Sequence, residues 1–313
     1  MKNYGFGVDI GGTTCKMGLF KTDGTLVDKW EIPTRTENKG VAILSDVAAA
    51  IDAKLEEKNI SKDDVQGVGV GVPGPVKTDG TVNGCVNLGW SVFNVADDLG
   101  AKVNLPVKVG NDANVAALGE MWMGAGKGRK NVVMVTLGTG VGGGIICDGK
   151  MISGANGAGG EIGHMTVNEH ETVACNCGKK GCLEQYTSAT GIVRLANMKL
   201  DETDESTSLR KFDSLTAKDI FDEAKAGDKV ANELVEQVCG ILGTAMAQIA
   251  CVADPEVFVI GGGVSKAGTI ITDNTKKAYR EKAFHACKDA EFVIATLGND
   301  AGIYGCCQLI LDV

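Results

Sequence analysis

Residues 9–20 (DIGGTTCKMGLF) and 135–147 (VTLGTGVGGGIIC) share one form: an apolar strand, a turn of Gly and Thr, and a second apolar strand. The second copy begins 126 residues after the first, and each opens a stretch in which strands alternate with helices. Repetition of one supersecondary unit is typical of a duplicated architecture. We therefore expect a duplicated fold with two facing lobes.

The rest of the chain favours the α/β class. Runs rich in Val and Ile predict further strands that are covered on both faces, at residues 65–71, 107–110, 257–260 and 292–296. Apolar stripes at helical spacing predict amphipathic helices over residues 44–55 and 234–249. The boundary between the lobes is expected near residues 105–114, where a short strand ends and a helix begins. Strands that alternate with helices are typical of α/β domains.

Composition and charge exclude several classes of protein. Glycine accounts for 44 of 313 residues without a triplet period, which indicates tight turns and close backbone approaches rather than collagen. The net charge of −9 makes nucleic acid an unfavourable partner. The N-terminus has no signal-peptide pattern, and the apolar run Cys239–Ala253 is too short to span a bilayer. We expect a cytoplasmic protein without a membrane partner, whose 11 cysteines are reduced or bind metal.

The two Gly/Thr turns are candidate phosphate sites. Residues 69–74 and 138–143 both match G-x-G-x-x-G, but neither opens a helix, so a dinucleotide site is not predicted. A turn such as residues 11–14 (GGTT) presents consecutive N–H groups and hydroxyls, which can hold phosphate oxygens. Asp9, just ahead of it, is placed to reach a hydrated Mg²⁺ on those phosphates. The alternative is a pair of ordinary turns; the occurrence of two copies favours phosphate binding.

Cysteine spacing predicts a structural zinc site. Cys175, Cys177 and Cys182 lie within eight positions, and His164 precedes them by eleven residues. Three sulfurs and one imidazole complete a closed tetrahedral zinc site. His170 competes with His164 as the fourth ligand, and spacing alone does not separate them. With four protein ligands the zinc has no open position for a catalytic water, which argues against a zinc hydrolase.

Three carboxylates stand out by their position. Asp112 follows a strand and starts a helix, where it serves either as an N-cap or as a base that deprotonates a substrate hydroxyl. Glu161 and Glu184 flank the proposed zinc module, so a rigid metal site could fix both as acceptors for hydroxyl groups. The spacing suggests a polyol site.

Together these segments resemble the ROK family of bacterial sugar kinases and repressors, most closely its glucokinases. The matching pieces occur in the family's order: residues 9–14 (DIGGTT), 110–114 (GNDAN), 137–144 (LGTGVGGG), 161–164 (EIGH), 175–184 (CNCGKKGCLE) and 260–264 (IGGGV). Each glycine piece alone is common, but the combination is highly specific.

The resemblance implies an actin-like, ribonuclease H-like fold of two lobes with ATP in the cleft. It implies a small lobe of residues 1–112 with about 300–313, and a large lobe of residues 113–299 that contains the zinc module, residues 164–184. The implied reaction, a step of carbohydrate metabolism and glycolysis, is transfer of the γ-phosphoryl group of ATP, with Mg²⁺, to the 6-hydroxyl of glucose. The implied assembly is a homodimer or homotetramer.

The resemblance also assigns roles by position. Asp112 would be the general base, and His164 would place one ring nitrogen on zinc and the other toward the sugar, which favours it over His170. The residues implied to bind the hexose are Asn87, Asn111, Asp112, Glu161, His164 and Glu184. Those implied to bind ATP are Asp9, Gly11, Gly12, Thr13, Thr14, Lys16, Gly138, Thr139 and Gly140, with Gly262 and Gly263 against the adenosine.

Other functions within the family remain as alternatives. N-acetylglucosamine, N-acetylmannosamine, fructose or allose could replace glucose as the substrate. A repressor carries a winged helix-turn-helix ahead of the sugar domain, whereas here the first hairpin starts at residue 9. A sugar sensor without catalysis is expected to lack the base, whereas Asp112 is present.

Overall fold

The computed structural model describes residues 2–311, and the chain forms two compact units. Unit 1 comprises the residues up to Gly128, Gly144–Gly160 and the residues from Thr296 onward. Unit 2 comprises Arg129–Gly143 and Glu161–Ala295. The expected division after residue 112 moves to Gly128, because helix α4 (Asp112–Met123) packs against α10 (Ala301–Leu311) within unit 1. Residues 312–313 of the expected C-terminal segment lie outside the described residues.

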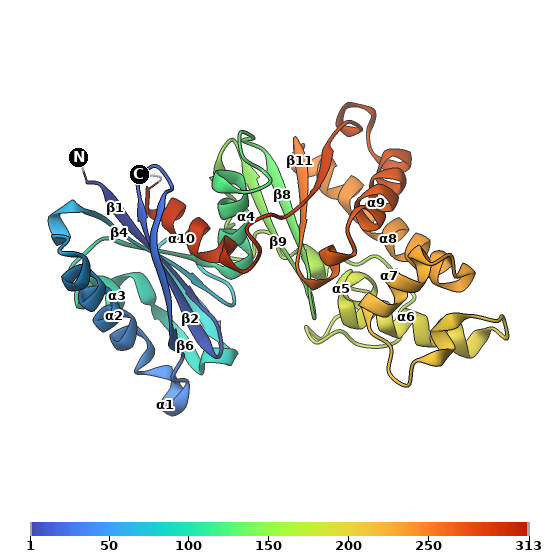
Figure 1. Ribbon diagram of the computed structural model, residues 1–313, viewed down its shortest axis with the longest axis horizontal. Coiled ribbons are helices and arrows are strands. Elements are labelled where there is room, and N and C mark those ends of the chain that lie inside the picture. The colour runs from blue at the N-terminus through green and yellow to red at the C-terminus, as the bar shows by residue number, and fades with distance from the viewer. Residues whose placement is uncertain (1, 312–313) are drawn as a thin grey trace. The chain divides into compact units, whose positions relative to one another are not determined.

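Unit 1 is built on a five-stranded sheet. Its strands are β1 (Tyr4–Ile10), β2 (Thr14–Lys21), β3 (Leu26–Pro33), β4 (Val65–Val72) and β7 (Val107–Asn111), in the order β3-β2-β1-β4-β7. The first three strands are antiparallel, and β1, β4 and β7 run parallel. Helices α2 (Ile43–Lys58) and α3 (Val95–Val103) cover one face, and α4 and α10 cover the other (Figure 1). The predicted helix over residues 44–55 is thus confirmed.

Glycines line the face of this sheet that contacts α10. A Cβ atom added at Gly69 in β4 would meet the backbone carbonyl of Cys306 in α10, and one at Gly7 in β1 would meet that of Ile303. On the opposite side of α10, a Cβ at Gly305 would meet the carbonyl of Val115 in α4. Backbone approaches this close exclude any side chain. Part of the high glycine content therefore allows the C-terminal helix α10 to pack closely against the sheet and α4.

A two-stranded ribbon extends unit 1 and carries one expected site residue. It consists of β5 (Thr81–Cys85) and β6 (Trp90–Asn94), with the short helix η2 (Val86–Leu88) at the tip. The last strand pair before the tip is Cys85 with Trp90. The short helix α1 (Glu37–Gly40) precedes α2, and η1 (Lys62–Asp64) precedes β4.

The second sheet repeats the pattern of the first. Its strands are β8 (Val132–Leu137), β9 (Val141–Cys147), β10 (Lys150–Met151), β11 (Val257–Gly261) and β12 (Glu291–Ile294), in the order β10-β9-β8-β11-β12. β11 runs parallel to β8 and to β12. β8 therefore has the place that β1 has in the first sheet, and each is followed by a Gly/Thr turn. The predicted duplicated α/β fold is confirmed.

Helices make up most of the rest of unit 2. They are η3 (Ile162–His164), α5 (Glu184–Thr187), α6 (Ala189–Glu202), η4 (Ser208–Lys211), α7 (Ala217–Lys225), α8 (Lys229–Ala253), η5 (Gly263–Ala267), α9 (Thr269–Lys282) and η6 (His285–Cys287); η7 (Gly298–Asp300) belongs to unit 1. The apolar run Cys239–Ala253, expected to be too short to span a bilayer, is part of α8. This helix has 25 residues and is long and apolar enough to cross a membrane. Its most apolar stretch is 56% buried, as in the core helix of a globular unit.

Candidate functional site

The first Gly/Thr turn is closed by the backbone and leaves its tip exposed. The N–H of Gly11 donates to the carbonyl of Thr14 at 3.0 Å, and the hydroxyl of Thr34 donates to the carbonyl of Gly11 at 2.7 Å. Gly12 and Thr13 are exposed at the tip. Two hydrogen bonds thus fix the turn while Gly12 and Thr13 stay exposed at its tip, which suits a phosphate-binding loop.

Asp9 and Asp112 interact electrostatically in unit 1. The pKa of Asp9, at the end of β1, is raised to about 6: burial and then the charge of Asp112 raise it, and the charge of Lys16 opposes both. Asp112 is exposed, yet partial loss of hydration of its carboxyl group among the surrounding residues raises its pKa too, against the lowering effect of hydrogen bonds from Ala113 and Asn111. A raised pKa makes a carboxylate a better proton acceptor near neutral pH.

Asn111 caps helix α4, so Asp112 is not needed for that role. The Oδ1 atom of Asn111 accepts from the N–H groups of Ala113 and Asn114 at 3.0 and 3.1 Å. Its Nδ2 donates to the carbonyl of Gly74 at 3.1 Å, and the residue is buried. Asn111 therefore holds the start of α4 in place, and Asp112 follows directly at the helix terminus.

Asn87 lies at the tip of the β5–β6 ribbon, where its side chain is exposed. A Cβ added at Gly12 would lie 4.0 Å from the carbonyl oxygen of Asn87. The ribbon tip and the first Gly/Thr turn are therefore neighbours within unit 1.

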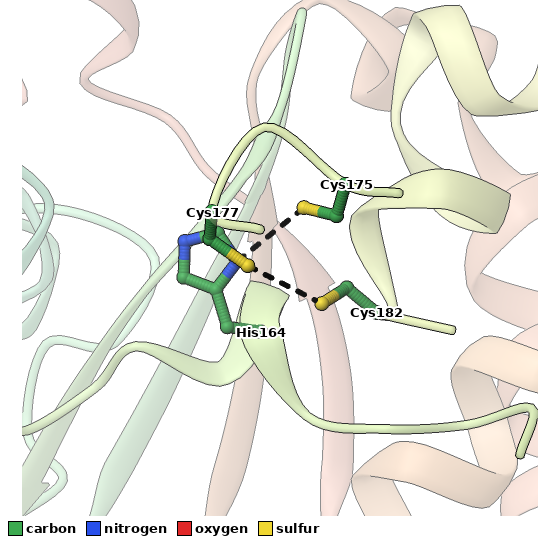
Figure 2. Close-up of side chains that lie close together, drawn as sticks. All are labelled: His164, Cys175, Cys177 and Cys182. Atoms are coloured by element: carbon green, nitrogen blue, oxygen red, sulfur yellow. Dashed lines mark hydrogen bonds between the residues drawn. The ribbon is translucent and has the colours of Figure 1, made fainter. Parts of the chain in front are cut away.

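Figure 2 shows the four predicted zinc ligands gathered in unit 2. The donor atoms of His164, Cys175, Cys177 and Cys182 all lie within 4.8 Å of one another. The Sγ atoms of Cys177 and Cys182 are 3.6 Å apart, and Nδ1 of His164 is 3.9 Å from Sγ of Cys175. Tetrahedral zinc separates its ligand atoms by about 3.3–3.8 Å, so the donor set fits that ion. His170 is exposed and outside this group, which resolves the competition in favour of His164.

The Cys₃His cluster contacts both carboxylates that flank it in sequence. The Cys175 thiol donates to Oε1 of Glu184 at 2.8 Å; burial, with this hydrogen bond, raises the thiol pKa to about 12. The Nε2 atom of His164, the nitrogen remote from Cys175, is 3.9 Å from Oε2 of Glu161. The Nδ1 side of the imidazole thus lies near Cys175 and Glu184, and its Nε2 side near Glu161.

The second Gly/Thr turn lies beside Glu184. Its backbone closes through Gly138 N–H to the carbonyl of Gly140 at 3.0 Å, and the hydroxyl of Thr190 donates to the carbonyl of Thr139 at 2.9 Å. A Cβ at Gly140 would come within 2.8 Å of Oε2 of Glu184. A cavity of about 320 Å³ is lined by Thr139, Gly140 and Glu184 among others. Unit 2 therefore brings the second candidate phosphate turn and Glu184, a candidate polyol ligand, together.

A mainly apolar pocket of about 280 Å³ adjoins Gly263 in unit 2. Ala217 and Phe221 of α7 and Val264 contribute its apolar wall. Gly262, with φ of 82°, is required because a Cβ there would lie 2.5 Å from the carbonyl of Leu137. Sequence reasoning found the two glycines but missed the α7 residues, whose signal was the apolar stripe Ala217, Ile220, Phe221 and Ala224.

A hydrogen-bonded network around Glu171 fixes the segment that precedes Cys175. Sequence reasoning missed this network as well. Glu171 accepts from the Tyr186 hydroxyl at 2.6 Å and from the Arg194 guanidinium at 2.7 Å. These contacts, Arg194 first, lower the pKa of Glu171 to about 2. The network ties the segment before Cys175 to α5 and α6, next to Glu184.

Comparison with known proteins matches the chain over nearly its full length. The sequence model of the ROK family matches residues 5–313. A glucokinase from Halalkalibacterium halodurans is 49% identical over 304 residues, 96% of this chain and 92% of the relative. The crystal structure of a ROK family glucokinase from Streptomyces griseus in complex with glucose and AMPPNP is similar with a TM-score of 0.74 and 34% identity, covering 98% of both chains. The ROK hexokinase from Thermus thermophilus has a TM-score of 0.82 and 29% identity, covering 98% of this chain and 97% of its own.

Proposed function

The chain belongs to the ROK family, and we propose that it transfers the γ-phosphoryl group of ATP to the 6-hydroxyl of glucose. The 49% identity to a glucokinase over almost the whole chain supports glucose as the substrate. ATP supplies the phosphoryl group and Mg²⁺ neutralises its charge.

The placement of Asp112 carries the proposal. It stands at the start of α4 without having to cap it, its pKa is raised, and it interacts with Asp9. Such a carboxylate can accept the proton of a sugar hydroxyl as that oxygen attacks phosphorus. A general base contributes about 10²–10⁴-fold to the rate.

We assign the nucleotide to the two Gly/Thr turns and the apolar pocket. The N–H groups at the tips of the two turns, Gly12–Thr13 and Thr139–Gly140, bind phosphate oxygens, and Asp9 holds the hydrated Mg²⁺. The pocket beside Gly263 suits the flat, largely apolar faces of an adenine base. Lys16 keeps Asp9 more acidic than it otherwise would be, which favours the ionised form that a cation needs.

We assign the sugar hydroxyls to Asn87, Glu161, His164 and Glu184, with Asn111 acting mainly by holding α4. Zinc would be held by His164 and the three cysteines, and its chemistry there is structural. Once zinc fixes the imidazole, the Nε2 atom keeps one orientation, beside Glu161. The metal-binding module thereby preorganises the polyol contacts.

We further infer a soluble, cytoplasmic enzyme that works as a homodimer or homotetramer without nucleic-acid partners. The net charge of −9 supports the absence of nucleic-acid partners, and the burial of α8 supports a soluble protein.

Product analysis tests the reaction itself. Incubation with glucose and Mg-ATP should give ADP and glucose 6-phosphate in equal amounts. The position of the phosphate is read from the NMR coupling between ³¹P and the protons on C6. 6-Deoxyglucose should bind but give no sugar phosphate. Phosphorylation at another hydroxyl, or ADP release without a sugar phosphate, contradicts the proposal.

A further inference from the structure

Three consecutive residues of α1 adopt the left-handed conformation. Asn38 and Lys39 have φ of 52° and 62°, and Gly40 follows with φ of 65°. A non-glycine residue in this region costs about 1–2 kcal/mol, and such strain persists only where surrounding contacts impose it. Glycine would avoid this cost, yet Lys39 occupies the middle of the turn. Surrounding contacts must therefore hold this left-handed turn (residues 38–40) in its conformation.

The left-handed turn packs against the ribbon tip. The indole Nε1 of Trp90 donates to the carbonyl of Gly40 at 3.2 Å. A Cβ added at Gly40 would lie 2.5 Å from the carbonyl oxygen of Leu88, and one at Gly89 would lie 3.0 Å from the Cα of Lys39. Both glycines have positive φ, so two left-handed segments fit together with no room for side chains.

The ribbon tip divides into buried anchors and exposed residues. Leu88 is fully buried and Trp90 is 7% exposed, whereas Val86 is 95% exposed and Asn87 is exposed beside it. The left-handed turn contacts the two anchors, Leu88 and Trp90. Asn87 is thus held in place by its neighbours along the chain, while its own side chain faces solvent, where a ligand can meet it.

On its other side the tip borders the proposed reaction site. The carbonyl of Asn87 lies next to Gly12 of the first Gly/Thr turn. Burial raises the pKa of the Cys85 thiol at the base of the tip, and the charge of Asp112 raises it further, which places the base of the tip within range of Asp112. Val41, which lines a cavity of about 300 Å³ with Gly40 and Trp90, is 73% exposed.

We propose that the left-handed turn, through Gly40 and its hydrogen bond from Trp90, is a positioning element that sets Asn87 against the hexose. The inference rests on the proposed function and adds Gly40 and Trp90 to the residues that determine sugar affinity. Neither touches the sugar: they act through Asn87.

The test is steady-state kinetics on Trp90→Phe, which keeps an aromatic ring but loses the N–H donor, and on Gly40→Ala. Each should raise the glucose KM about tenfold, the effect of losing roughly one hydrogen bond, while kcat and the ATP KM change less than twofold. Matched controls in unit 1 are Trp122→Phe, whose ring packs on Phe20 and Tyr304, and Gly100→Ala, whose Cβ would meet nothing closer than 3.5 Å. The controls should leave the glucose KM unchanged.

A double-mutant cycle separates positioning from general destabilisation. Asn87→Ala should raise the glucose KM, and adding Trp90→Phe to it should then have no further effect on that constant, since the turn acts only through Asn87. Additive effects, or an unchanged KM in both Trp90→Phe and Gly40→Ala, overturn the inference. Absence of turnover in the wild-type enzyme instead refutes the proposed function. If Gly40→Ala fails to fold, Trp90→Phe alone decides.

Discussion

Asn111 and Asp112 show how two adjacent polar residues divide the work at the start of one helix. Asn111 supplies the cap and donates from its amide to the carbonyl of Gly74, while burial raises the pKa of Asp112 despite a hydrogen bond from Asn111 that lowers it. An aspartate at a helix start is usually a cap. Here its neighbour takes that role, which leaves Asp112 available for catalysis.

Asp112→Asn should lower kcat by about 10²–10⁴-fold, since the amide cannot accept the proton. The glucose Kd should change little, because Asn keeps the shape and Asn111 still caps α4. Calorimetric titration and initial rates measure both quantities. The control is Asp98→Asn on α3, which should retain wild-type rates. A kcat within threefold of wild type for Asp112→Asn removes this residue from the mechanism.

The rate should depend on pH through the carboxylates of unit 1. Asp9 and Asp112 must both be ionised to act. Because their pKa values are raised, to about 6 for Asp9, kcat/KM should fall as pH falls through those values. Because the positive charge of Lys16 lowers the pKa of Asp9, Lys16→Gln should move the acid limb to higher pH. A pH–rate profile of each enzyme decides; a limb that moves to lower pH, or that lies near 4 in the wild type, contradicts the assignment.

Site residues that form a recognisable local motif could be predicted from the sequence. Residues whose role depends on hydrogen bonds to distant parts of the chain could not. The Cys₃His set was predicted because three thiols clustered at turn spacing favour a metal site, and geometry then chose His164 over His170. Glu171, Tyr186 and Arg194 escaped because nothing local distinguishes them; their meaning lies in contacts across 15 to 23 positions.

At the scale of elements, the C-terminal helix α10 is held by backbone contact rather than by large side chains. Gly7 and Gly69 in the sheet and Gly305 in the helix permit approaches that any side chain would block. The first turn of α10 also lies against Asp9, since a Cβ at Gly302 would come within 2.5 Å of its Oδ2. The packing of this helix therefore helps to position Asp9, part of the proposed reaction site.

Gly69→Ala should destabilise the protein by about 2 kcal/mol or more, because the added methyl group meets the backbone of Cys306 and nothing flexible can move aside. Gly240→Ala in α8 is the matched control: its Cβ meets nothing within 4 Å, so it should stabilise by up to about 1 kcal/mol. Urea unfolding of both variants measures the change. Equal effects would contradict the close packing of α10.

Cys177→Ser should weaken zinc retention and raise the glucose KM, because the metal-loaded Cys₃His cluster fixes the orientation of His164. The matched control is Cys251→Ser, an exposed cysteine on α8, which should keep both metal and affinity. Metal content by mass spectrometry, read beside the glucose KM, is the measurement. Full zinc with a normal KM in Cys177→Ser means that the metal-binding module has been misassigned.

Elements with a simple periodicity were predicted well. The stripes over residues 44–55 and 234–249 became α2 and α8, and the Val-rich runs became β4, β7, β11 and β12. β3 was missed because charged residues alternate with Leu26, Trp30 and Ile32 at a sheet edge, and β5 and β6 because their runs are short and polar. Edge strands and ribbons carry weak patterns, since water covers one of their faces.

At the scale of the whole molecule, duplication organises both the fold and the proposed chemistry. Each sheet has the same strand order around a Gly/Thr turn, and each turn is a candidate for binding phosphate. The duplication was visible in sequence because the turn chemistry is local. The return of Gly144–Gly160 to unit 1 was not visible, because it depends on contacts that a sequence does not display.

Glucose as the preferred substrate is decided by ADP release from Mg-ATP, with glucose, N-acetylglucosamine, N-acetylmannosamine, mannose, fructose and allose compared side by side. We expect a kcat/KM for glucose at least about tenfold above the others, which corresponds to ~1.4 kcal/mol of transition-state binding. A higher kcat/KM for an N-acetylated sugar or for fructose would contradict glucose as the substrate, and no turnover with any hexose would contradict the kinase itself.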